Sequence, residues 1–322
     1  MNLPATSASL FRTALQAARD AAGSQDYPQG TLYVVATPIG NLADVTLRAL
    51  HVLELADAIA CEDTRHTQSM LRAYGIDRKP GGQLLAVHQH NEAEAAQAVI
   101  SRLAQGERVA YVSDAGTPGV SDPGARLAAA VRAAGHRVLP LPGASSVTTL
   151  ISAAGLVAAD ADDYSAFVFA GFLPSKATER DGAVARLAAE PRAVLLLEAP
   201  HRIEALARAL AALGPRPITV GRELTKQFEE IDTVPCDALA GWLAAKDQRT
   251  RGEFALVLHP QPAGGDAKAD EGERVLQLLL PELPVKTAVR LAAEISGAPR
   301  NALYERALQL RKAGEDEPGE ED

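Results

Sequence analysis

The sequence has few cysteines and no long hydrophobic run. Its 322 residues include only Cys61 and Cys236, too few for a disulfide framework or a CxxC metal site. Such sparse thiols are typical of a reducing compartment, so we expect a cytoplasmic protein. No stretch of about 18 apolar residues is present, which argues against a membrane-spanning helix. The N-terminal region also lacks the continuous apolar segment of a secretory signal peptide.

Familiar motifs for metal and nucleotide binding are missing as well. The sequence has no HExxH motif, no EF-hand loop and no Cys/His pair with zinc spacing, so we expect no metal site. The glycine-rich loop at residues 113–124 contains no lysine and matches neither GxGxxG nor GxxxxGK[ST]. These absences argue against a dinucleotide-binding loop or a P-loop there.

The net charge of −9 at pH 7 is unevenly distributed. The last ten residues hold six acids and no base, whereas residues 285–312 hold six bases and two acids. A local basic surface can coexist with an acidic total. The net charge therefore neither supports nor excludes an RNA partner.

Apolar segments of strand length alternate with segments of helical periodicity from Gly30 onward. This alternation predicts an α/β fold with a largely parallel sheet, followed by a second α/β domain. We expect strands at residues 31–36, 58–61, 84–87, 109–112, 137–140, 166–170, 193–197, 217–220 and 254–259. We expect helices at residues 43–54, 67–74, 93–103, 125–134, 145–154, 177–189 and 203–213.

The chain length suggests about two domains of roughly 150 residues each. We place the two α/β domains at residues 30–160 and 161–260. We interpret residues 1–29 as a flexible N-terminal extension, residues 261–272 as a linker rich in Pro, Gly and Asp, and residues 313–322 as an acidic tail.

Residues 273–312 contain two helical patterns separated by Gly297 and Pro299. A helix, a short glycine-containing turn and a second helix are typical of a helix-turn-helix-like appendage. Its excess of basic residues favours contact with RNA phosphates. The alternative is that these helices only pack within the protein or in a dimer.

Clusters of polar side chains follow several of the predicted strands. They are the loop at residues 113–124 and the segments 62–66, 198–202 and 222–226. Ligands of open α/β sheets bind at the carboxyl ends of strands, so we expect these segments to surround a ligand. The loop at 113–124 has two aspartates and no base, which favours a cationic or hydroxyl-rich ligand over a phosphate.

Six motifs in order carry a family resemblance over about residues 30–258. They are Thr37-Pro-Ile-Gly-Asn-Leu42, Glu62-Asp-Thr-Arg65, Ser113-Asp-Ala-Gly-Thr-Pro118 with Ser121-Asp-Pro-Gly124, Gly171-Phe-Leu-Pro174, Pro200-His-Arg202 and Arg222-Glu-Leu-Thr-Lys226. Together they closely resemble the ribosomal RNA small subunit methyltransferase I family. These enzymes are 16S rRNA cytidine 2′-O-methyltransferases of the tetrapyrrole methylase superfamily.

The resemblance implies a two-domain tetrapyrrole methylase-like fold with a small C-terminal helical appendage. It also implies S-adenosylmethionine as the cofactor, a homodimer, and 16S rRNA of the 30S subunit, in its decoding region, as the substrate. By position, the residues expected to contact the cofactor are Pro38, Gly40, Asp114, Gly116, Thr117, Ser145, Ser146, Leu197, Glu198 and Leu224. Ala144 stands where the family commonly has proline, which leaves this loop less constrained.

The family reaction requires a base to remove the proton of a ribose hydroxyl. His66, His201 and Glu62 are the candidates, and the sequence does not order them. The residues expected to hold RNA phosphates are Arg65, Arg202, Lys226, Arg290 and Arg300. An alternative for the second motif is a buried Glu62–Arg65 pair that only orders the loop.

Two other functions stay open at this point. One is the C-methylation of a tetrapyrrole such as a precorrin or uroporphyrinogen. The other is a noncatalytic RNA-binding assembly factor that retains S-adenosylmethionine as a structural ligand.

Overall fold

The computed structural model describes residues 7–77, 82–88, 91–122, 124–157, 166–261 and 267–315. The chain divides into two units. The larger consists of Met1–Gly155, Val168–Leu187 and Val194–Leu258 and carries nearly all of two β-sheets. The smaller consists of Leu156–Phe167, Ala188–Ala193 and His259–Asp322. Both sheets thus belong mainly to one unit, and the boundary expected at residue 160 falls outside the described residues.

The first sheet contains β1 (Thr31–Val35), β2 (Ala58–Cys61), β3 (Leu84–Ala86), β4 (Val109–Val112) and β5 (Arg137–Leu141). The four strand pairings are parallel, as the alternation of strands and helices predicts, and the strand order is β3-β2-β4-β1-β5. The helices that connect or flank these strands are α1 (Ser7–Ala22), α2 (Leu47–Leu55), α3 (Thr64–Tyr74), α4 (Glu92–Ala104), α5 (Ala125–Ala133) and α6 (Ser146–Ala153), with a 3₁₀ turn at Leu42–Asp44.

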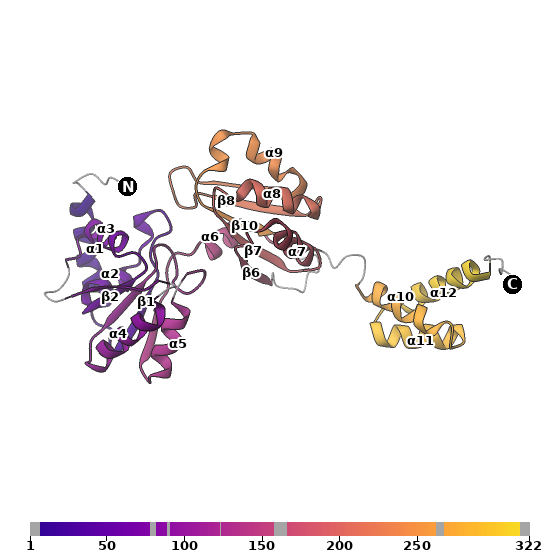
Figure 1. Cartoon of the computed structure of the whole chain (residues 1–322), viewed down its shortest axis with the longest axis horizontal. Coiled ribbons are helices and arrows are strands. Elements are labelled where there is room, and N and C mark those ends of the chain that lie inside the picture. The colour runs from indigo at the N-terminus through magenta and orange to yellow at the C-terminus, as the bar shows by residue number, and fades with distance from the viewer. Residues whose placement is uncertain are drawn as a thin grey trace. The chain divides into compact units, whose positions relative to one another are not determined.

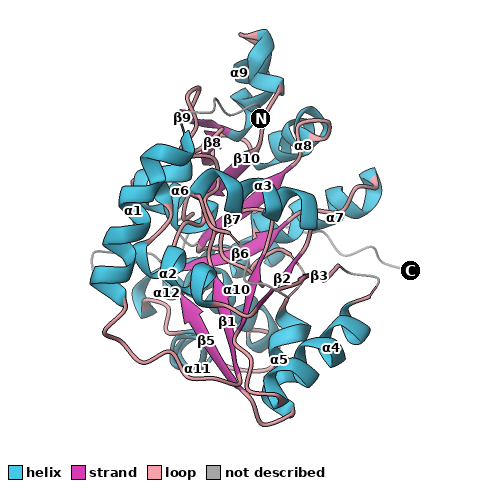
Figure 2. Cartoon of the chain, turned by 90° about the vertical axis from the view of Figure 1, so that its left-hand side faces the viewer, coloured by secondary structure: helices cyan, strands magenta, loops and turns pink. Residues whose placement is uncertain are grey.

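Helices cover both faces of this sheet. Figure 2 shows α1 and α2 on one side of the strands and α4 and α5 on the other. The side chains of β1 alternate accordingly: Tyr33 and Val35 belong to the core on the first side, and Leu32 to the core on the second. Because both faces are buried, the strand is a continuous apolar run.

The N-terminal segment differs from the flexible extension that we expected. Within residues 1–29, α1 packs against α2 and α3 on one side of the sheet, and Leu15 and Ala18 are buried there. Phe11 meets Tyr74 edge-on with ring centroids 5.0 Å apart. Positions 11, 15, 18 and 22 recur at helical spacing, which places them on one face. The interpretation as a flexible extension rested on the composition of this segment and did not take this periodicity into account.

The second sheet contains β6 (Phe167–Gly171), β7 (Ala193–Glu198), β8 (Pro217–Arg222), β9 (Glu230–Pro235) and β10 (Phe254–Leu258), in the order β6-β7-β10-β8-β9. β10 runs antiparallel to both β7 and β8, and β9 runs antiparallel to β8. The helical segments are α7 (Ala177–Ala188), α8 (Ile203–Leu210) and α9 (Leu239–Ala244), with 3₁₀ turns at Ala211–Leu213, Cys236–Ala238 and Asp247–Thr250.

β9 and α9 were not expected from the sequence. β9 is a largely exposed edge strand with a polar sequence, so it lacks the apolar run by which the buried strands were found. Its charged residues are typical of an edge strand that avoids pairing with other chains.

The C-terminal helices form a core of their own. They are α10 (Ala267–Leu279), α11 (Val285–Ser296) and α12 (Arg300–Glu315), shown in orange and yellow in Figure 1. Leu276, Val289, Ala292 and Leu303 are buried among them. α11 ends at Gly297, whose φ of 71° suits the left-handed cap that glycine adopts readily. The appendage therefore has three helices, and α10 begins inside the segment that we interpreted as a linker.

Candidate functional site

Two loops of the first sheet are joined at the carboxyl ends of β1 and β4. The amide of Thr37 donates to the carbonyl of Gly116 at 2.9 Å, and the amide of Gly116 donates back at 3.0 Å. Gly116 has a φ of 82°, and a Cβ there would lie 3.3 Å from Cγ2 of Ile39. Glycine is therefore required both by the backbone and by the close approach of the first loop.

Further hydrogen bonds tie the loops after β2 and β5 to the same place. The hydroxyl of Thr117 donates to the carbonyl of Ala144 at 3.0 Å. The amide of Asp63 donates to a carboxylate oxygen of Asp114 at 3.2 Å. Four loops that are distant in sequence thus meet at one edge of a parallel sheet, where α/β proteins bind their ligands.

The second sheet contributes the loop after β8 to the same site. Glu223 and Thr225 have φ angles of 52° and 65°, values that residues other than glycine rarely adopt. The hydroxyl of Thr225 accepts a hydrogen bond from the amide of Asn41 at 3.2 Å. A Cβ at Gly40 would lie 3.1 Å from the carbonyl oxygen of Leu224, so the first loop and this loop are in close contact. Backbone strain of this kind is frequent at ligand sites.

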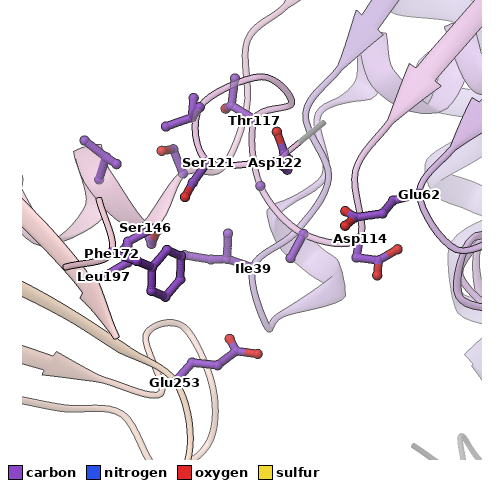
Figure 3. Close-up of a pocket in the computed structure, with 15 residues that line it drawn as sticks. Ile39, Glu62, Asp114, Thr117, Ser121, Asp122, Ser146, Phe172, Leu197 and Glu253 are labelled. Carbon is purple, nitrogen blue, oxygen red and sulfur yellow. The ribbon is translucent and has the colours of Figure 1, made fainter. Parts of the chain in front are cut away.

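Three adjoining cavities lie among these loops, with volumes of about 350, 310 and 270 Å³. We name them the first, second and third cavity in that order. Ile39 and Glu253 line all three, so the cavities are neighbours in one cleft. Figure 3 shows the first cavity, with Ile39 near its centre, Phe172 and Leu197 on one side and Glu62 and Asp114 on the other.

Every residue expected to contact the cofactor lines at least one cavity. The first cavity has Asp114, Gly116, Thr117, Ser145, Ser146 and Leu197; the second has Ser146, Leu197, Glu198 and Leu224; the third has Pro38, Gly40 and Asp114. The structure therefore brings together positions that are up to 186 residues apart in the chain.

The wall of the first cavity is acidic. Burial, followed by the charges of Asp114 and Asp122, raises the pKa of the Glu62 carboxyl. Burial also raises the pKa of Asp122, whose carboxylate accepts a hydrogen bond from the amide of Gly119. Crowded carboxylates gain most from a positively charged ligand, because such a ligand relieves their mutual repulsion. This wall fits the sulfonium and ammonium groups of S-adenosylmethionine.

Glu198, at the end of β7, adds a buried acceptor to the second cavity. One carboxylate oxygen accepts from the amide of Ala199 at 2.9 Å and forms an ion pair with Nε of Arg202 at 3.1 Å. The other oxygen is buried and has no hydrogen-bond partner within the described part of the chain. A buried acceptor without a partner is costly. Amino or hydroxyl donors of a bound nucleoside are the kind of group that fits it.

The structure separates the candidate bases. Glu62 lines the first cavity and His66 lines the third. His201 is exposed and lines none of the three cavities. His66 and Glu62 are therefore better placed than His201 to meet a substrate in this cleft.

The expected phosphate-binding residues differ in whether their side chains are exposed, buried in the protein or part of a cavity wall. Arg65 is 92% exposed and its ion pair is with Asp63 at 3.5 Å, so the alternative of a buried Glu62–Arg65 pair is wrong. Arg202 is turned into the protein, where it also donates to the carbonyl of Leu173. Lys226 lines the third cavity.

Lys226 and Arg290 have acidic neighbours, and Arg300 is exposed. Lys226 forms ion pairs with Glu223 at 2.9 Å and Glu253 at 3.1 Å. Arg290 is exposed and paired with Glu294 at 3.1 Å. Arg300 is exposed at the start of α12.

Sequence reasoning missed Glu253, which lines all three cavities of the cleft. The polar clusters expected at the site all follow strands, whereas Glu253 immediately precedes β10. Because β10 is antiparallel, its first residue Phe254 pairs with Glu198 at the end of β7 and with Arg222 at the end of β8. Phe172 was also missed, although the Gly-Phe-Leu-Pro motif that contains it was a visible signal.

Comparison with family models and solved structures identifies the architecture. Residues 31–240 match the model for tetrapyrrole (corrin/porphyrin) methylases, and residues 266–311 match the RsmI C-terminal HTH domain. Cobalt precorrin-4 methyltransferase superposes with a TM-score of 0.51 at 18% identity over 72% of this chain and 98% of that one. Uroporphyrin-III-C-methyltransferase from Thermus thermophilus gives a TM-score of 0.50 at 23% identity over 72% and 94%. At such identities these two structures establish the fold alone.

Curated relatives are much closer in sequence. Ribosomal RNA small subunit methyltransferase I of Escherichia coli O157:H7 is 43% identical over 89% of this chain and 97% of its own length. The protein of the same name from Xylella fastidiosa (strain Temecula1) is 45% identical over 85% and 98%. These comparisons confirm the fold class, the family and the S-adenosylmethionine-dependent methylase chemistry that the motifs predict. The chain belongs to the tetrapyrrole methylase family and, within it, to the ribosomal RNA small subunit methyltransferase I family.

Proposed function

We propose that this chain transfers a methyl group from S-adenosylmethionine to the ribose 2′-oxygen of a cytidine in the decoding region of 16S rRNA. The observation that carries the proposal is the 43–45% identity, over at least 85% of the chain, to proteins named ribosomal RNA small subunit methyltransferase I. The cleft supports it, since all ten expected cofactor residues line three adjoining cavities.

The residues of the cleft have distinct roles in this proposal. S-adenosylmethionine, when bound, supplies an electrophilic methyl group on a sulfonium ion. Glu62, Asp114 and Asp122 provide negative charge that matches a cationic ligand. The free carboxylate oxygen of Glu198 accepts a hydrogen bond from a nucleoside donor. The hydrogen bonds between Thr37 and Gly116 fix the two loops relative to each other. These loops would thereby position the methyl donor for in-line attack, and positioning contributes most of the rate.

A base must accept the proton of the attacking hydroxyl. We assign this role to His66, with Glu62 as the alternative, because both line the cleft. The raised pKa of Glu62 makes it a stronger proton acceptor than an ordinary carboxylate.

The three C-terminal helices are proposed to hold RNA phosphates. Their exposed bases include Lys286, Arg290, Arg300 and Arg311. Such contacts give affinity that depends steeply on salt and little on sequence. We further propose that the active protein is a cytoplasmic homodimer. Sedimentation equilibrium tests the dimer, and cell fractionation tests the location.

The test of the function is methyl transfer from labelled S-adenosylmethionine to 30S subunits that lack the modification, followed by nuclease mapping. Label on a cytidine 2′-oxygen of 16S rRNA is the expected result. Subunits that already carry the modification are the matched control and should take up no label. No label on either 30S subunits or free 16S rRNA, with cofactor binding intact, would favour a tetrapyrrole substrate, and then a noncatalytic role.

A further inference from the structure

One face of α3 forms a wall of the third cavity. His66, Ser69, Met70 and Ala73 line it. Their spacing of three, four and seven residues places them in a single stripe along the helix. The stripe is fixed at its N-terminal end, because the carboxylate of Asp63 accepts from the amides of Arg65 at 2.7 Å and His66 at 3.3 Å.

We propose that the third cavity is the chamber for the acceptor nucleoside, which is turned out of the RNA to reach it. The proposal rests on the proposed function and assigns the cavity a ligand class, a single pyrimidine nucleoside. Enzymes that do chemistry on a base of a folded nucleic acid commonly extrude the nucleotide into a pocket, and the proposal extends this to a reaction at the ribose.

Position in the cleft is the first argument. The third cavity shares Asp114 and Ala115 with the first cavity, and Ile39 and Glu253 with both others. Of the expected cofactor positions, Pro38, Gly40 and Asp114 line it, whereas none of the later ones, from Ser145 to Leu224, does. Methyl transfer needs donor and acceptor atoms within about 3–3.5 Å, so the acceptor chamber must adjoin the cofactor site without being part of it.

Size and lining are the second argument. The volume of about 270 Å³ is slightly smaller than that of ordinary small-molecule sites, which are typically about 300–1,000 Å³. It suits one nucleoside better than a macrocycle of four pyrrole rings. Leu42, Met70 and Ala73 offer apolar surface to a base, while His66, Ser69 and Lys226 offer polar groups to its edge and to the ribose.

The surface beside the stripe is the third argument. Arg65 and Arg72 are exposed and lie seven residues apart on α3, on the strip next to His66 and Ala73. Two arginines at this spacing are placed to hold the phosphates on either side of an extruded nucleotide. The helix would thus combine a base-facing stripe with a phosphate-facing strip.

The test fills the chamber from α3, a helix that carries none of the expected cofactor positions. Ser69→Phe places a large ring in the third cavity from an exposed position, and Ser69→Leu does so with a smaller side chain. Gln68→Phe is the matched control, since Gln68 is on the same helix and lines none of the three cavities. Circular dichroism checks the fold, calorimetry gives the S-adenosylmethionine Kd, and labelled 30S subunits give kcat/KM.

We expect both Ser69 variants to keep the wild-type S-adenosylmethionine Kd within about twofold, while kcat/KM falls about 100-fold in Ser69→Phe and remains unchanged in Gln68→Phe. Weakened cofactor binding in a folded Ser69 variant would overturn the proposal, because the cavity would then belong to the cofactor. Equal transfer by wild type and Ser69→Phe would overturn the chamber alone. Absence of transfer by the wild-type protein would overturn the proposed function, and the chamber with it.

Discussion

Replacing Gly116 by alanine tests whether the joined loops hold the cofactor site in shape. An L-residue at a φ of 82° is strained by about 1–2 kcal/mol. The new Cβ would also lie 3.3 Å from Ile39, which lines all three cavities. If the loop relaxes, the two hydrogen bonds with Thr37 are broken and must be restored when the cofactor binds.

The affinity for S-adenosylmethionine should therefore fall by about 5–30-fold, the equivalent of about 1–2 kcal/mol. The Kd is measured by calorimetry, and thermal unfolding gives the change in stability.

Gly135→Ala is a matched control for backbone strain. Gly135 has nearly the same φ, 83°, but a Cβ there would have no neighbour within 4 Å. Both variants should lose similar stability, and only Gly116→Ala should lose affinity. An unchanged Kd in Gly116→Ala, or an equal loss in Gly135→Ala, would refute the idea that the joined loops shape the site.

Three further predictions concern stability, catalysis and RNA binding. Glu230→Gln should lower the free energy of unfolding at pH 7 by about 1–2 kcal/mol, less than the full pKa shift implies because solvent screens the pair. Arg249 first and Lys246 next hold the pKa of this carboxyl at about 2, below its ordinary 4.5. This difference in stability between wild type and variant is fully present above pH 4.5 and is lost as the pH falls through about 2. Urea unfolding at several pH values measures it. A stability difference that does not change with pH would contradict the prediction. His66→Ala should lower kcat about 100-fold with an unchanged cofactor Kd, and His201→Ala should lower it much less; the opposite order in single-turnover assays would exchange their roles. Deletion of residues 262–322, which removes α10–α12 whole, should weaken RNA binding and flatten its salt dependence; an unchanged slope of log Kd against log salt would refute RNA contact by these helices.

Local patterns in the sequence predicted most of the first sheet and most of the candidate site. The strands of the parallel sheet are buried on both faces, so each appears as a short apolar run that is legible without its neighbours. The expected cofactor residues mostly follow these strands, and the loops at the carboxyl ends of the strands are where an α/β sheet binds its ligands. That is why all ten expected cofactor positions line the cavities, although no two motifs are adjacent in the chain.

The ion-pair and hydrogen-bond partners of individual side chains could not be predicted from local patterns. Arg202 was expected at a phosphate, yet its guanidinium forms an ion pair with Glu198 and donates to Leu173. Arg65 was considered as a partner of Glu62, yet it pairs with Asp63. A charged side chain looks the same in a sequence whether its counter-ion is a neighbour, a distant residue or a ligand.

The sequence by itself determined the family, the order of most buried elements and a set of expected cofactor positions that all line the cleft, because these depend on periodicity and on motifs of a few residues. Only the tertiary structure decided that α1 packs into the core, that an antiparallel strand brings Glu253 to the cleft, and that His66 rather than His201 lines a cavity. Each of these depends on which segments meet in space. That is settled by burial and strand direction across the whole fold, which no single segment encodes.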